Sequence, residues 1–455
     1  MPLSFDGQRI LILGAGVTGN AVARSLVKRG AAVSFADENP AAKSEHTVID
    51  AKNVVIKDFD SVVVSPGWRQ DHPLVVAAMA AGLTLLNEVD LAWQIKSEMA
   101  PGQKWLALTG TNGKTTTVEM VAAMLKSGGL KATACGNVGE TVIEVVDRSD
   151  AFDVLVLELS SFQLHWSKQA QFVACAILNI ADDHIDWHGS FDAYAKAKLT
   201  ILDRATTAVL NASDGEILKR SSHWQGRKVF YSLETPAPGE IGLVEELLVD
   251  RAFVQDPQEA SMFAELAEVK PTIPHNVSNT LAAAALARTV GVSHEDIRSA
   301  IKAFRPGRHR IETVHTADSI NWVDDSKATN PHAATASLLS HESVIWIAGG
   351  LAKGAAMEEL VERTAKRIKA AILIGTDRNL IEAALIKFCP DVPRVLIDGD
   401  SSQELMEKVV SAAQGFAQSG DTVLLAPACA SMDQFVSYAD RGDRFAAAVK
   451  KVVSK

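Results

Sequence analysis

Residues 105–120 read WLALTGTNGKTTTVEM, and this stretch decides how the middle of the chain folds. Its apolar start predicts a buried strand, its glycine-rich centre a tight turn, and the residues from Lys114 onward a helix. Backbone N–H groups of such a turn form a nest for anions, while Lys114 adds a positive charge for the β- and γ-phosphates of a nucleotide and Thr115 offers a hydroxyl to Mg²⁺. The spacing departs from the common phosphate loop, because Leu108 occupies the position five before Gly113, where a glycine is usual. The candidate phosphate loop consists of Gly110, Thr111, Asn112, Gly113, Lys114, Thr115 and Thr116.

A second glycine-rich turn lies near the start of the chain, in GQRILILGAGVTGNAV (7–22). An apolar strand precedes it, a helix follows it, and Asp37 ends the next predicted strand, which is the context of a dinucleotide site. The spaced glycines are Gly14, Gly16 and Gly19. A diphosphate on the backbone amides at this helix N-terminus would fit NAD, FAD or a UDP-sugar equally. The alternative is a turn that only packs the helix against the strand, and a further turn at 65–67 could line the same crevice.

Length, charge and cysteine content narrow the class of protein. The chain has 455 residues, which is too long for one compact core. Its formal net charge of -10 argues against a nucleic-acid-binding protein, because phosphate contacts require a basic face. The four cysteines are far apart and contain no CxxC pair, so neither a disulfide framework nor a zinc site is expected. Without a charged-then-apolar leader or an apolar run of membrane length, we expect a soluble cytoplasmic protein.

Short β-branched strands alternate with amphipathic helices along the chain, which predicts an α/β fold. Two polar, turn-rich segments interrupt this pattern, SEMAPGQ at 97–103 and RPGRHR at 305–310. We therefore expect three domains, covering residues 1–96, 97–305 and 306–455. The third is expected to begin with a hairpin in RIETVHTADSINWVDDS, with its turn in TAD.

Acidic residues and histidines follow two predicted strands in the middle of the chain. The segment FDVLVLELSSFQ places Glu158 and Ser160 at the carboxyl end of an apolar strand, where α/β sheets bind ligands. A carboxylate is costly to bury alone, so Glu158 is expected either to contact a metal ion or to form a core ion pair. The next strand ends in a cluster formed by Asp182, Asp183, His184, Asp186 and His188. This cluster suits Mg²⁺ or Mn²⁺, although a solvated loop can have the same composition.

Lys198 lies on the apolar face of a predicted helix. Phe191, Tyr194, Ala195 and Leu202 form a stripe at helical spacing, and Lys198 falls on this stripe whereas Lys196 does not. In one interpretation the side chain runs along apolar surface and its amine reaches solvent. In the other, the amine reacts with CO₂ to form a carbamate, a longer carboxylate that could bind a metal ion. The sequence leaves both interpretations open.

Eight motifs in this order resemble those of the Mur ligases: GTNGKTT, ELSSFQL, DDHIDWH, YAKAKL, HNVSNTLAAAAL, GRHRIE, DDSKATNP and APACASMDQF. The resemblance spans essentially the whole chain. GTNGKTT is shared among Mur ligases and with folylpolyglutamate synthases, whereas DSKATNP together with ACASMDQF is more specific to the branch that adds D-glutamate.

This resemblance implies a Rossmann-like N-terminal domain that binds UDP, a P-loop ATPase-like central domain that binds ATP, and a Rossmann-like C-terminal domain. It implies an ADP-forming ligase of peptidoglycan precursor synthesis that adds D-glutamate to UDP-N-acetylmuramoyl-L-alanine through an acyl phosphate. The implied cofactors are two Mg²⁺ ions, with Mn²⁺ as a substitute, and a CO₂-derived carbamate on Lys198. Its partners would be these small-molecule substrates, with no nucleic acid and no membrane, and the enzyme would be a monomer.

The resemblance also implies roles for single residues. Besides the phosphate loop, ATP contacts are expected at Asn276, Asn279, Arg310 and Asp325. Contacts to the UDP-substrate are expected at Gly14, Gly16, Val17, Thr18, Asp37, Gly67, Asn137 and His184. Contacts to D-glutamate are expected at Thr329, Lys353, Ser431 and Tyr438. Metal ligands are expected at Thr115, Glu158, Ser160, His184 and Lys198. Catalytic groups are expected at Lys114, Glu158, His184, Lys198, His309 and Arg310.

Two positions depart from the family pattern. Leu351 stands where relatives often carry an acid two residues before the lysine, so the resemblance does not identify the group that holds Lys353. Tyr438 stands where an aromatic residue without a hydroxyl is common, so that wall of the amino-acid pocket is expected to be more polar.

Three other functions are compatible with parts of the sequence. Another ligase of the Mur or folylpolyglutamate type would share GTNGKTT, but a folylpolyglutamate synthase should lack the N-terminal GAGVTG unit. An NAD-dependent oxidoreductase would use the first turn and leave the phosphate loop and Glu158 without a role. A non-catalytic nucleotide-binding switch would bind ATP without amino-acid-dependent turnover.

Overall fold

A computed structural model describes residues 4–39, 41–42, 44–148, 152–256, 258–399 and 403–453. Contacts divide the chain into two compact units. The first compact unit comprises Met1–Ile180, Gly189–Thr272 and Asn276–Phe304, and the second comprises Ala181–His188, Ile273–His275 and Arg305–Lys455. Within the described residues, no helix is long and apolar enough to cross a membrane.

The N-terminal part of the first compact unit is a five-stranded parallel sheet with the order β3-β2-β1-β4-β5. Its strands are β1 (Arg9–Leu13), β2 (Ala32–Asp37), β3 (Val48–Asp50), β4 (Ser61–Val64) and β5 (Thr84–Leu86). Its helices are α1 (Val17–Val27), α2 (Pro73–Ala80) and α3 (Glu88–Met99). The predicted turn between β1 and α1 is confirmed, and its third glycine is required there. A Cβ on Gly19 would lie 2.0 Å from the carbonyl oxygen of Gly14.

A nine-stranded sheet with the order β14-β13-β12-β11-β10-β9-β6-β8-β7 forms the rest of this unit. The strands are β6 (Lys104–Thr109), β7 (Ala132–Gly136), β8 (Val154–Glu158), β9 (Phe172–Ile177), β10 (Ala205–Asn211), β11 (Arg227–Tyr231), β12 (Glu240–Val244), β13 (Leu247–Asp250) and β14 (Ser261–Glu265). Strands β6 to β12 pair in parallel, whereas β13 and β14 extend one edge in antiparallel pairing.

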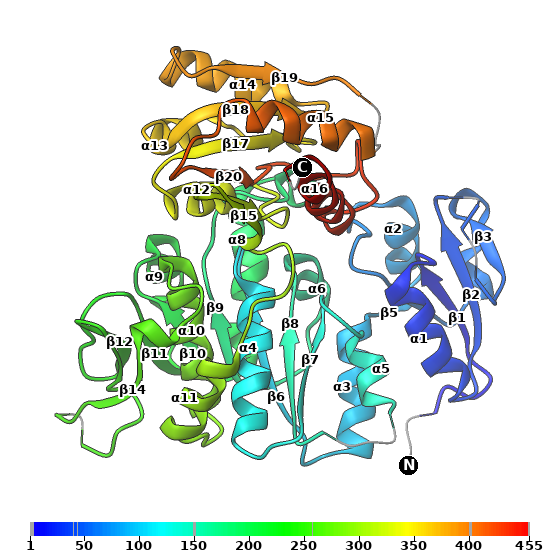
Figure 1. Cartoon of the computed structure of the whole chain (residues 1–455). Helices are drawn as coiled ribbons and strands as arrows, with labels where there is room; N and C mark the ends of the chain where they lie inside the picture. Colours follow the sequence, from blue (N-terminus) through cyan, green and yellow to red (C-terminus); the bar gives the residue numbers. More distant parts are fainter. Residues whose placement is uncertain are drawn as a thin grey trace. The chain divides into compact units, whose positions relative to one another are not determined.

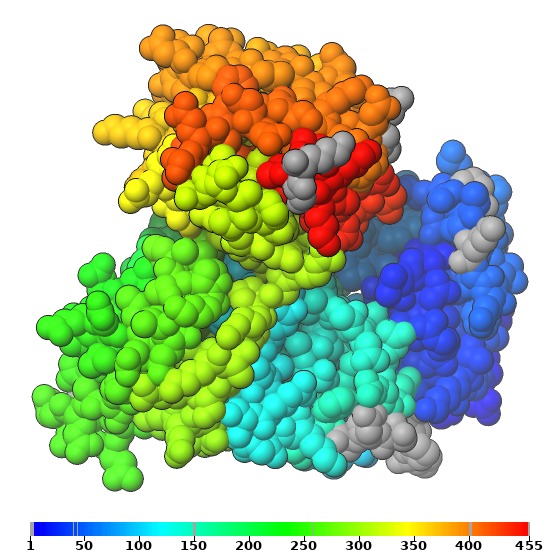
Figure 2. Space-filling view, in the orientation of Figure 1, coloured from blue at the N-terminus to red at the C-terminus, as the bar shows by residue number. Residues whose placement is uncertain are grey.

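Helices α4 (Lys114–Ser127), α10 (Pro274–Arg288) and α11 (His294–Ala303) pack against this sheet through a core that alanine and β-branched residues dominate. The other helices beside this sheet are α5 (Val142–Val146), α6 (Ser161–Trp166), α8 (Phe191–Leu199) and α9 (Gly215–Ser221). Helices α4 and α11 contact each other and lie side by side at the surface, cyan and yellow-green in Figure 2. The phosphate-loop strand β6 is central in the sheet, between β9 and β8, so its carboxyl end is flanked by two parallel strands.

The second compact unit contains a six-stranded sheet with the order β15-β16-β20-β17-β18-β19 (Figure 1). The strands are β15 (Glu312–Ala317), β16 (Ile320–Asp324), β17 (Val344–Gly349), β18 (Ile368–Ile374), β19 (Arg394–Leu396) and β20 (Thr422–Leu425). The expected hairpin is confirmed as the antiparallel pair β15–β16, with a turn at Asp318 and Ser319 in which both residues have positive φ. The other pairs are parallel.

Alternation along β17 gives this sheet two covered faces. Val344, Trp346 and Ala348 belong to one buried cluster, whereas Ile345 and Ile347 belong to another. The first cluster includes residues of α12 (Pro331–Leu339), α13 (Glu358–Thr364) and α14 (Arg378–Phe388), and the second includes residues of α15 (Gln403–Gln414) and α16 (Tyr438–Val453). The near-continuous apolar strands therefore reflect burial on both faces of a largely parallel sheet.

Candidate functional site

The phosphate loop connects β6 to α4, as the sequence predicts, and its last glycine has a left-handed backbone. Gly113 has a φ of 81°, and a Cβ at this position would lie 2.4 Å from the Oδ1 of Asn279. Any larger residue would therefore collide with the start of α10 as well as strain the turn. This close approach places Asn279, one of the expected ATP contacts, directly against the loop.

Hydrogen bonds fix the conformation of this loop. The amine of Lys114 donates to the carbonyl oxygens of Gly110 at 3.0 Å and Thr111 at 2.9 Å. Asn179, just after β9, accepts from the backbone N–H of Asn112 at 2.7 Å through its Oδ1 and donates to the Asn112 carbonyl through its Nδ2 at 3.1 Å. Because both the N–H and the C=O group of Asn112 are hydrogen-bonded to Asn179, the backbone of the loop is fixed at this residue.

Lys198 is buried behind the phosphate loop. Its side chain is on α8, the residue is 2% exposed, and its Nζ donates to the Gly110 carbonyl at 2.8 Å. The same Nζ lies 4.6 Å from the ring centroid of Tyr194, whose hydroxyl is 2.9 Å from the Oγ1 of Thr111. The interpretation in which this amine reaches solvent is therefore wrong. Lys198 and Tyr194 both contact the loop from the interior.

Glu158 ends β8 and is 2% exposed. Its Oε1 accepts a hydrogen bond from the Nδ2 of Asn137 at 2.8 Å. Its Oε2 is buried and has no hydrogen-bond partner among the described residues. An orphaned carboxylate oxygen is costly in the interior unless a cation binds it, so Glu158 fits a metal ligand.

An open cleft of about 480 Å³ lies between the glycine turn of the N-terminal sheet and the loops after β7 and β8. Six of the eight residues expected to contact the UDP-substrate line this cleft. They are Gly14, Gly16, Val17, Thr18, Gly67 and Asn137. Ser160 lines it as well, and the hydroxyl of Ser160 caps α6 by accepting from the Gln163 backbone N–H at 3.2 Å.

Asp37 and His184 do not line this cleft. The carboxylate of Asp37 instead accepts from the backbone N–H groups of Ala15 at 2.8 Å and Asn39 at 2.9 Å, so it stiffens the glycine turn from behind. His184 belongs to the second compact unit, directly before the short helix α7 (Ile185–His188). It has a positive φ of 53°, and its Nε2 lies 3.5 Å from the Oδ2 of Asp183.

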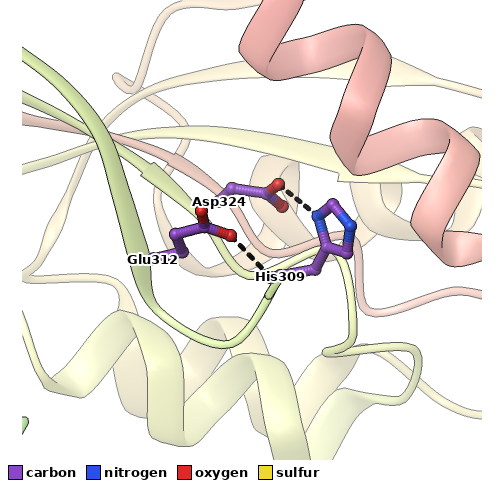
Figure 3. A group of neighbouring side chains, drawn as sticks. All are labelled: His309, Glu312 and Asp324. Atoms are coloured by element: carbon purple, nitrogen blue, oxygen red, sulfur yellow. Dashed lines mark hydrogen bonds and ion pairs between the residues drawn. The ribbon is translucent and has the colours of Figure 1, made fainter. Parts of the chain in front are cut away.

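In the second compact unit, His309 is held by two acidic residues (Figure 3). Its Nδ1 lies 2.7 Å from the Oδ2 of Asp324, and its backbone N–H donates to the Oε2 of Glu312 at 2.9 Å. The hydrogen bond with Asp324 raises the pKa of the His309 imidazole above its ordinary value. Both His309 and Ile311 have positive φ, a strained backbone that recurs at functional sites. Arg310 lies between them in the sequence.

Asp325 is buried next to this group. Its Oδ1 accepts from the Ile311 backbone N–H at 3.3 Å, and burial raises the pKa of its carboxyl group to about 7. Asp325 therefore gains a proton more readily than an exposed aspartate. A nearby cation would favour its charged form.

The four expected D-glutamate contacts follow strands of the third sheet. Thr329 precedes α12, Lys353 follows β17, Ser431 follows β20, and Tyr438 begins α16. Ser431 is buried, whereas Lys353 is exposed and has a left-handed φ of 52°. The ring centroid of Tyr438 lies 4.0 Å from the Nζ of Lys327. Lys327 lies in the motif DDSKATNP, which predicts no role for it.

Family models match three successive parts of the chain. The Mur ligase MurD-like N-terminal domain matches residues 8–87, the Mur ligase middle domain 108–287, and the glutamate ligase domain of Mur ligases 309–429. The chain belongs to the Mur ligase family. It therefore has the three-domain α/β fold of Mur ligases, with parallel and mixed sheets.

Relatives match this Mur ligase over its whole length. UDP-N-acetylmuramoylalanine–D-glutamate ligase of Thermobifida fusca is 47% identical, and the alignment covers 98% of this chain and 99% of that protein. The protein of the same name from Streptomyces coelicolor is 43% identical, with 99% and 100% covered. Among solved structures, a pseudomurein peptide ligase type C of Methanothermus fervidus has a TM-score of 0.62 at 18% identity, covering 98% and 100% of the two chains. UDP-N-acetylmuramate–alanine ligase of Thermotoga maritima has a TM-score of 0.59 at 19% identity, covering 98% and 100%.

Asn179 shapes the site of this Mur ligase but was not predicted from the sequence. Asn179 was passed over because it stands between an apolar strand and the acidic cluster at 182–188 and belongs to no motif of its own. The available signal was its position, since polar residues just after a central parallel strand face the ligand edge of the sheet. Tyr194 was assigned only to an apolar stripe, and nothing in the helical pattern reveals its hydroxyl contact with Thr111.

Proposed function

We propose that this protein is an ATP-dependent ligase that adds D-glutamate to UDP-N-acetylmuramoyl-L-alanine in the cytoplasm, forming ADP and phosphate during peptidoglycan precursor synthesis. The observation that carries the proposal is the 47% identity, over 98% of this chain, with UDP-N-acetylmuramoylalanine–D-glutamate ligase of Thermobifida fusca. In this chain the phosphate loop is present, and Lys114 and Asn179 hold it by hydrogen bonds. The fold alone would not distinguish this ligase from others of the family.

The reaction joins an acid to an amine in two steps. The L-alanine carboxylate attacks the γ-phosphorus of ATP, the bond from this phosphorus to the bridging oxygen breaks, and ADP leaves as the acyl phosphate forms. The amine of D-glutamate attacks the acyl carbon through a tetrahedral intermediate, loses a proton, and phosphate leaves. Lys114 and Arg310 would neutralise the negative charge gathered in the first step. Two buried partners of the loop, Lys198 and Tyr194, would keep it in place during that step.

We propose two metal sites in this protein. Thr115 and Ser160 would hold one Mg²⁺, while Glu158, His184 and a carbamate on Lys198 would hold the other. When bound, Mg²⁺ or Mn²⁺ supplies positive charge to the phosphate and carboxylate oxygens. The orphaned Oε2 of Glu158 is the feature of this chain that favours such a site. Lys198 would carry the carbamate by reaction of its neutral amine with CO₂ and release of one proton.

The substrates are assigned to separate places. We place the UDP portion in the cleft at the glycine turn, where backbone amides at the start of α1 can bind a diphosphate and Asp37 supports the turn. ATP would lie on the phosphate loop, with Asn276 and Asn279 near the adenosine. His309, Arg310 and Asp325 are further proposed nucleotide contacts. D-glutamate would contact Thr329, Lys353, Ser431 and Tyr438, where a cation and hydroxyls suit two carboxylates.

We propose three domains, with limits at 1–96, 97–305 and 306–455, and the presence of three separate sheets supports the number of domains. We describe the first as Rossmann-like because of its strand order β3-β2-β1-β4-β5. Strands β2 and β3 are added on one side of β1 and strands β4 and β5 on the other, as in dinucleotide-binding folds. The central domain is P-loop ATPase-like, and the third is Rossmann-like with an antiparallel edge strand. We propose a monomer that acts on small molecules, without nucleic acid or membrane as partner.

The deciding experiment measures ADP release by the purified protein with ATP, Mg²⁺ and UDP-N-acetylmuramoyl-L-alanine, with amino acids added one at a time. Release that requires D-glutamate, with a product heavier by one glutamyl residue, supports the proposal. Release with a different amino acid would keep the ligase mechanism and reassign the pocket, beginning with Leu351 and Tyr438. ATP binding without amino-acid-dependent release would instead favour a nucleotide-binding switch.

A further inference from the structure

Three loops of the third sheet meet at one edge. Strands β20, β17 and β18 are adjacent and parallel, so the segments that follow them leave from the same end of the sheet. The loop after β17 (350–354) contains Lys353, and the loop after β20 (426–434) contains Ser431. The turn after β18 (375–377) leads into α14 and contains none of the residues so far assigned to a substrate.

The Lys353 loop and the Ser431 loop are joined directly. The backbone N–H of Leu351 donates to the Ala430 carbonyl, and the backbone N–H of Ala430 donates to the Leu351 carbonyl, both at 2.9 Å. This isolated antiparallel bridge fixes Leu351, but it does not include Ala352 and Lys353. Lys353, with its left-handed φ of 52°, needs further support, because a side chain rarely adopts this conformation unless the surroundings impose it.

Asp377 provides that support from the turn after β18. Its Oδ2 accepts a hydrogen bond from the backbone N–H of Ala352 at 2.8 Å. Its own backbone N–H donates to the Gly350 carbonyl at 3.0 Å. Asp377 therefore binds the Lys353 loop on both sides of Leu351. Its bond to the N–H of Ala352, the residue directly before Lys353, is charge-assisted.

Asp433 fixes the turn itself. Its Oδ2 accepts from the backbone N–H of Thr376 at 2.8 Å, and it stands two residues after Ser431. The turn also packs closely against the Lys353 loop, since a Cβ on Gly375 would lie 2.4 Å from the backbone nitrogen of Gly350. The contacts thus form a closed ring from the Lys353 loop through Asp377, Thr376 and Asp433 to the Ser431 loop.

We propose that Asp377 is a positioning residue for D-glutamate, which holds the Lys353 loop in its left-handed conformation, and that Asp433 anchors Asp377 to the Ser431 loop. This inference rests on the proposed function, in which Lys353 and Ser431 bind D-glutamate. It also explains how the loop dispenses with an acid at Leu351. A carboxylate from the turn after the neighbouring strand β18 fixes the backbone of the loop in place of an acid within the loop itself.

The test compares Asp377→Ala and Asp377→Asn with a matched control, Asp398→Asn. Asp398 is 87% exposed and pairs with Arg378, the first residue of α14, rather than with either loop. We expect D377A to raise the KM for D-glutamate by roughly tenfold or more, because a charge-assisted hydrogen bond is lost. The KM values for ATP and for the UDP-substrate should not change. D377N should restore most of the affinity, since an amide oxygen can accept from Ala352, and D398N should resemble the wild type.

Hydrogen exchange in the protein without substrates gives a second readout. In D377A the amides of 350–354 should exchange faster than in the wild type and D398N. If D377A does not fold, Asp377→Ser replaces it in the test. The serine side chain is too short for its hydroxyl to reach the backbone N–H of Ala352, so this variant also lacks the hydrogen bond. Unchanged exchange at 350–354, or KM values that rise equally for all three substrates, would overturn the inference. If the wild type shows no D-glutamate-dependent ADP release, the proposed function fails, while the exchange result still decides whether Asp377 holds the loop.

Discussion

The amine of Lys198 lies 2.8 Å from the carbonyl oxygen of Gly110, the first residue of the phosphate loop. Lysines are rarely buried without a polar partner, and Lys198 is only 2% exposed. Here its hydrogen bond links helix α8 to the phosphate loop. A carbamate nitrogen keeps one N–H, so this contact and a metal-binding carboxylate are compatible on the same side chain.

We predict that removal of CO₂ from the buffer at mildly alkaline pH lowers turnover and that added bicarbonate restores it, because carbamate formation needs both CO₂ and a neutral amine. The measurement is the rate of ADP release, together with the ¹³C NMR spectrum of protein equilibrated with ¹³C-bicarbonate. Lys196, exposed on the same helix, gives the matched control, since Lys196→Arg should keep the carbamate signal and Lys198→Arg should lose it. Full activity after CO₂ removal, with no such signal, would contradict the prediction.

The orphaned Oε2 of Glu158 leads to a second prediction. Glu158→Gln keeps the size of the side chain and the contact with Asn137 but removes the charge that a metal ion would need. We expect kcat to fall on the order of 10²-fold or more, while the unfolding temperature stays the same or rises because a buried charge is lost. Kinetics and thermal unfolding measure the two effects, with the exposed Glu140→Gln as control. A loss of stability without loss of kcat would instead assign Glu158 a structural role.

Asn179 should act through the phosphate loop. Asn179→Ala removes both hydrogen bonds to Asn112, and we expect the KM for ATP to rise about tenfold, since loss of a buried partner costs about 1–3 kcal/mol. Asn211 is a suitable control, because its Nδ2 donates at 2.9 Å to the Leu178 carbonyl, next to Asn179. Asn211→Ala removes an amide of the same size without touching the loop. Equal ATP affinities in the two variants would show that Asn179 does not organise the site.

Much of the fold could be predicted from local sequence. The strand before Gly110 and the helix from Lys114 are encoded by adjacent residues, and the hairpin up to Asp324 carries its own turn. The antiparallel edge formed by β13 and β14 was not predicted, because Leu247–Asp250 and Ser261–Glu265 are short and acquire their pairing only from the strands beside them.

Site residues could be predicted where they stand inside a recognisable motif. They could not be predicted where a side chain supports the site from a different helix, strand or turn. Lys114 and Thr115 stand inside the motif they serve. Asp377 supports the Lys353 loop from the turn after β18, and no spacing in the sequence reveals that the two lie at the same sheet edge until β17 and β18 are paired. Burial of Lys198 was equally undecided, because a helical stripe does not say how deeply its helix is packed.

The burial of Glu88, outside the proposed site, predicts a pH-dependent stability. It begins α3, it is 2% exposed, and its Oε1 accepts from the backbone N–H of Ile143 at 2.8 Å at the start of α5. Burial raises the pKa of its carboxyl group from 4.5 to about 7. Between these two values the unfolded chain releases the proton while the folded chain keeps it, so stability falls as the pH rises.

We therefore predict that Glu88→Gln, which resembles the protonated side chain, removes this dependence. Relative to E88Q, the wild type should lose on the order of 3 kcal/mol of unfolding free energy between pH 4.5 and pH 8, because each pKa unit corresponds to about 1.4 kcal/mol. Denaturant unfolding at several pH values measures the difference. Glu98→Gln, an exposed change on the same helix, should follow the wild-type curve. Parallel curves for E88Q and the wild type would mean that Glu88 is already ionised in the folded protein and is held by the N–H groups of α5.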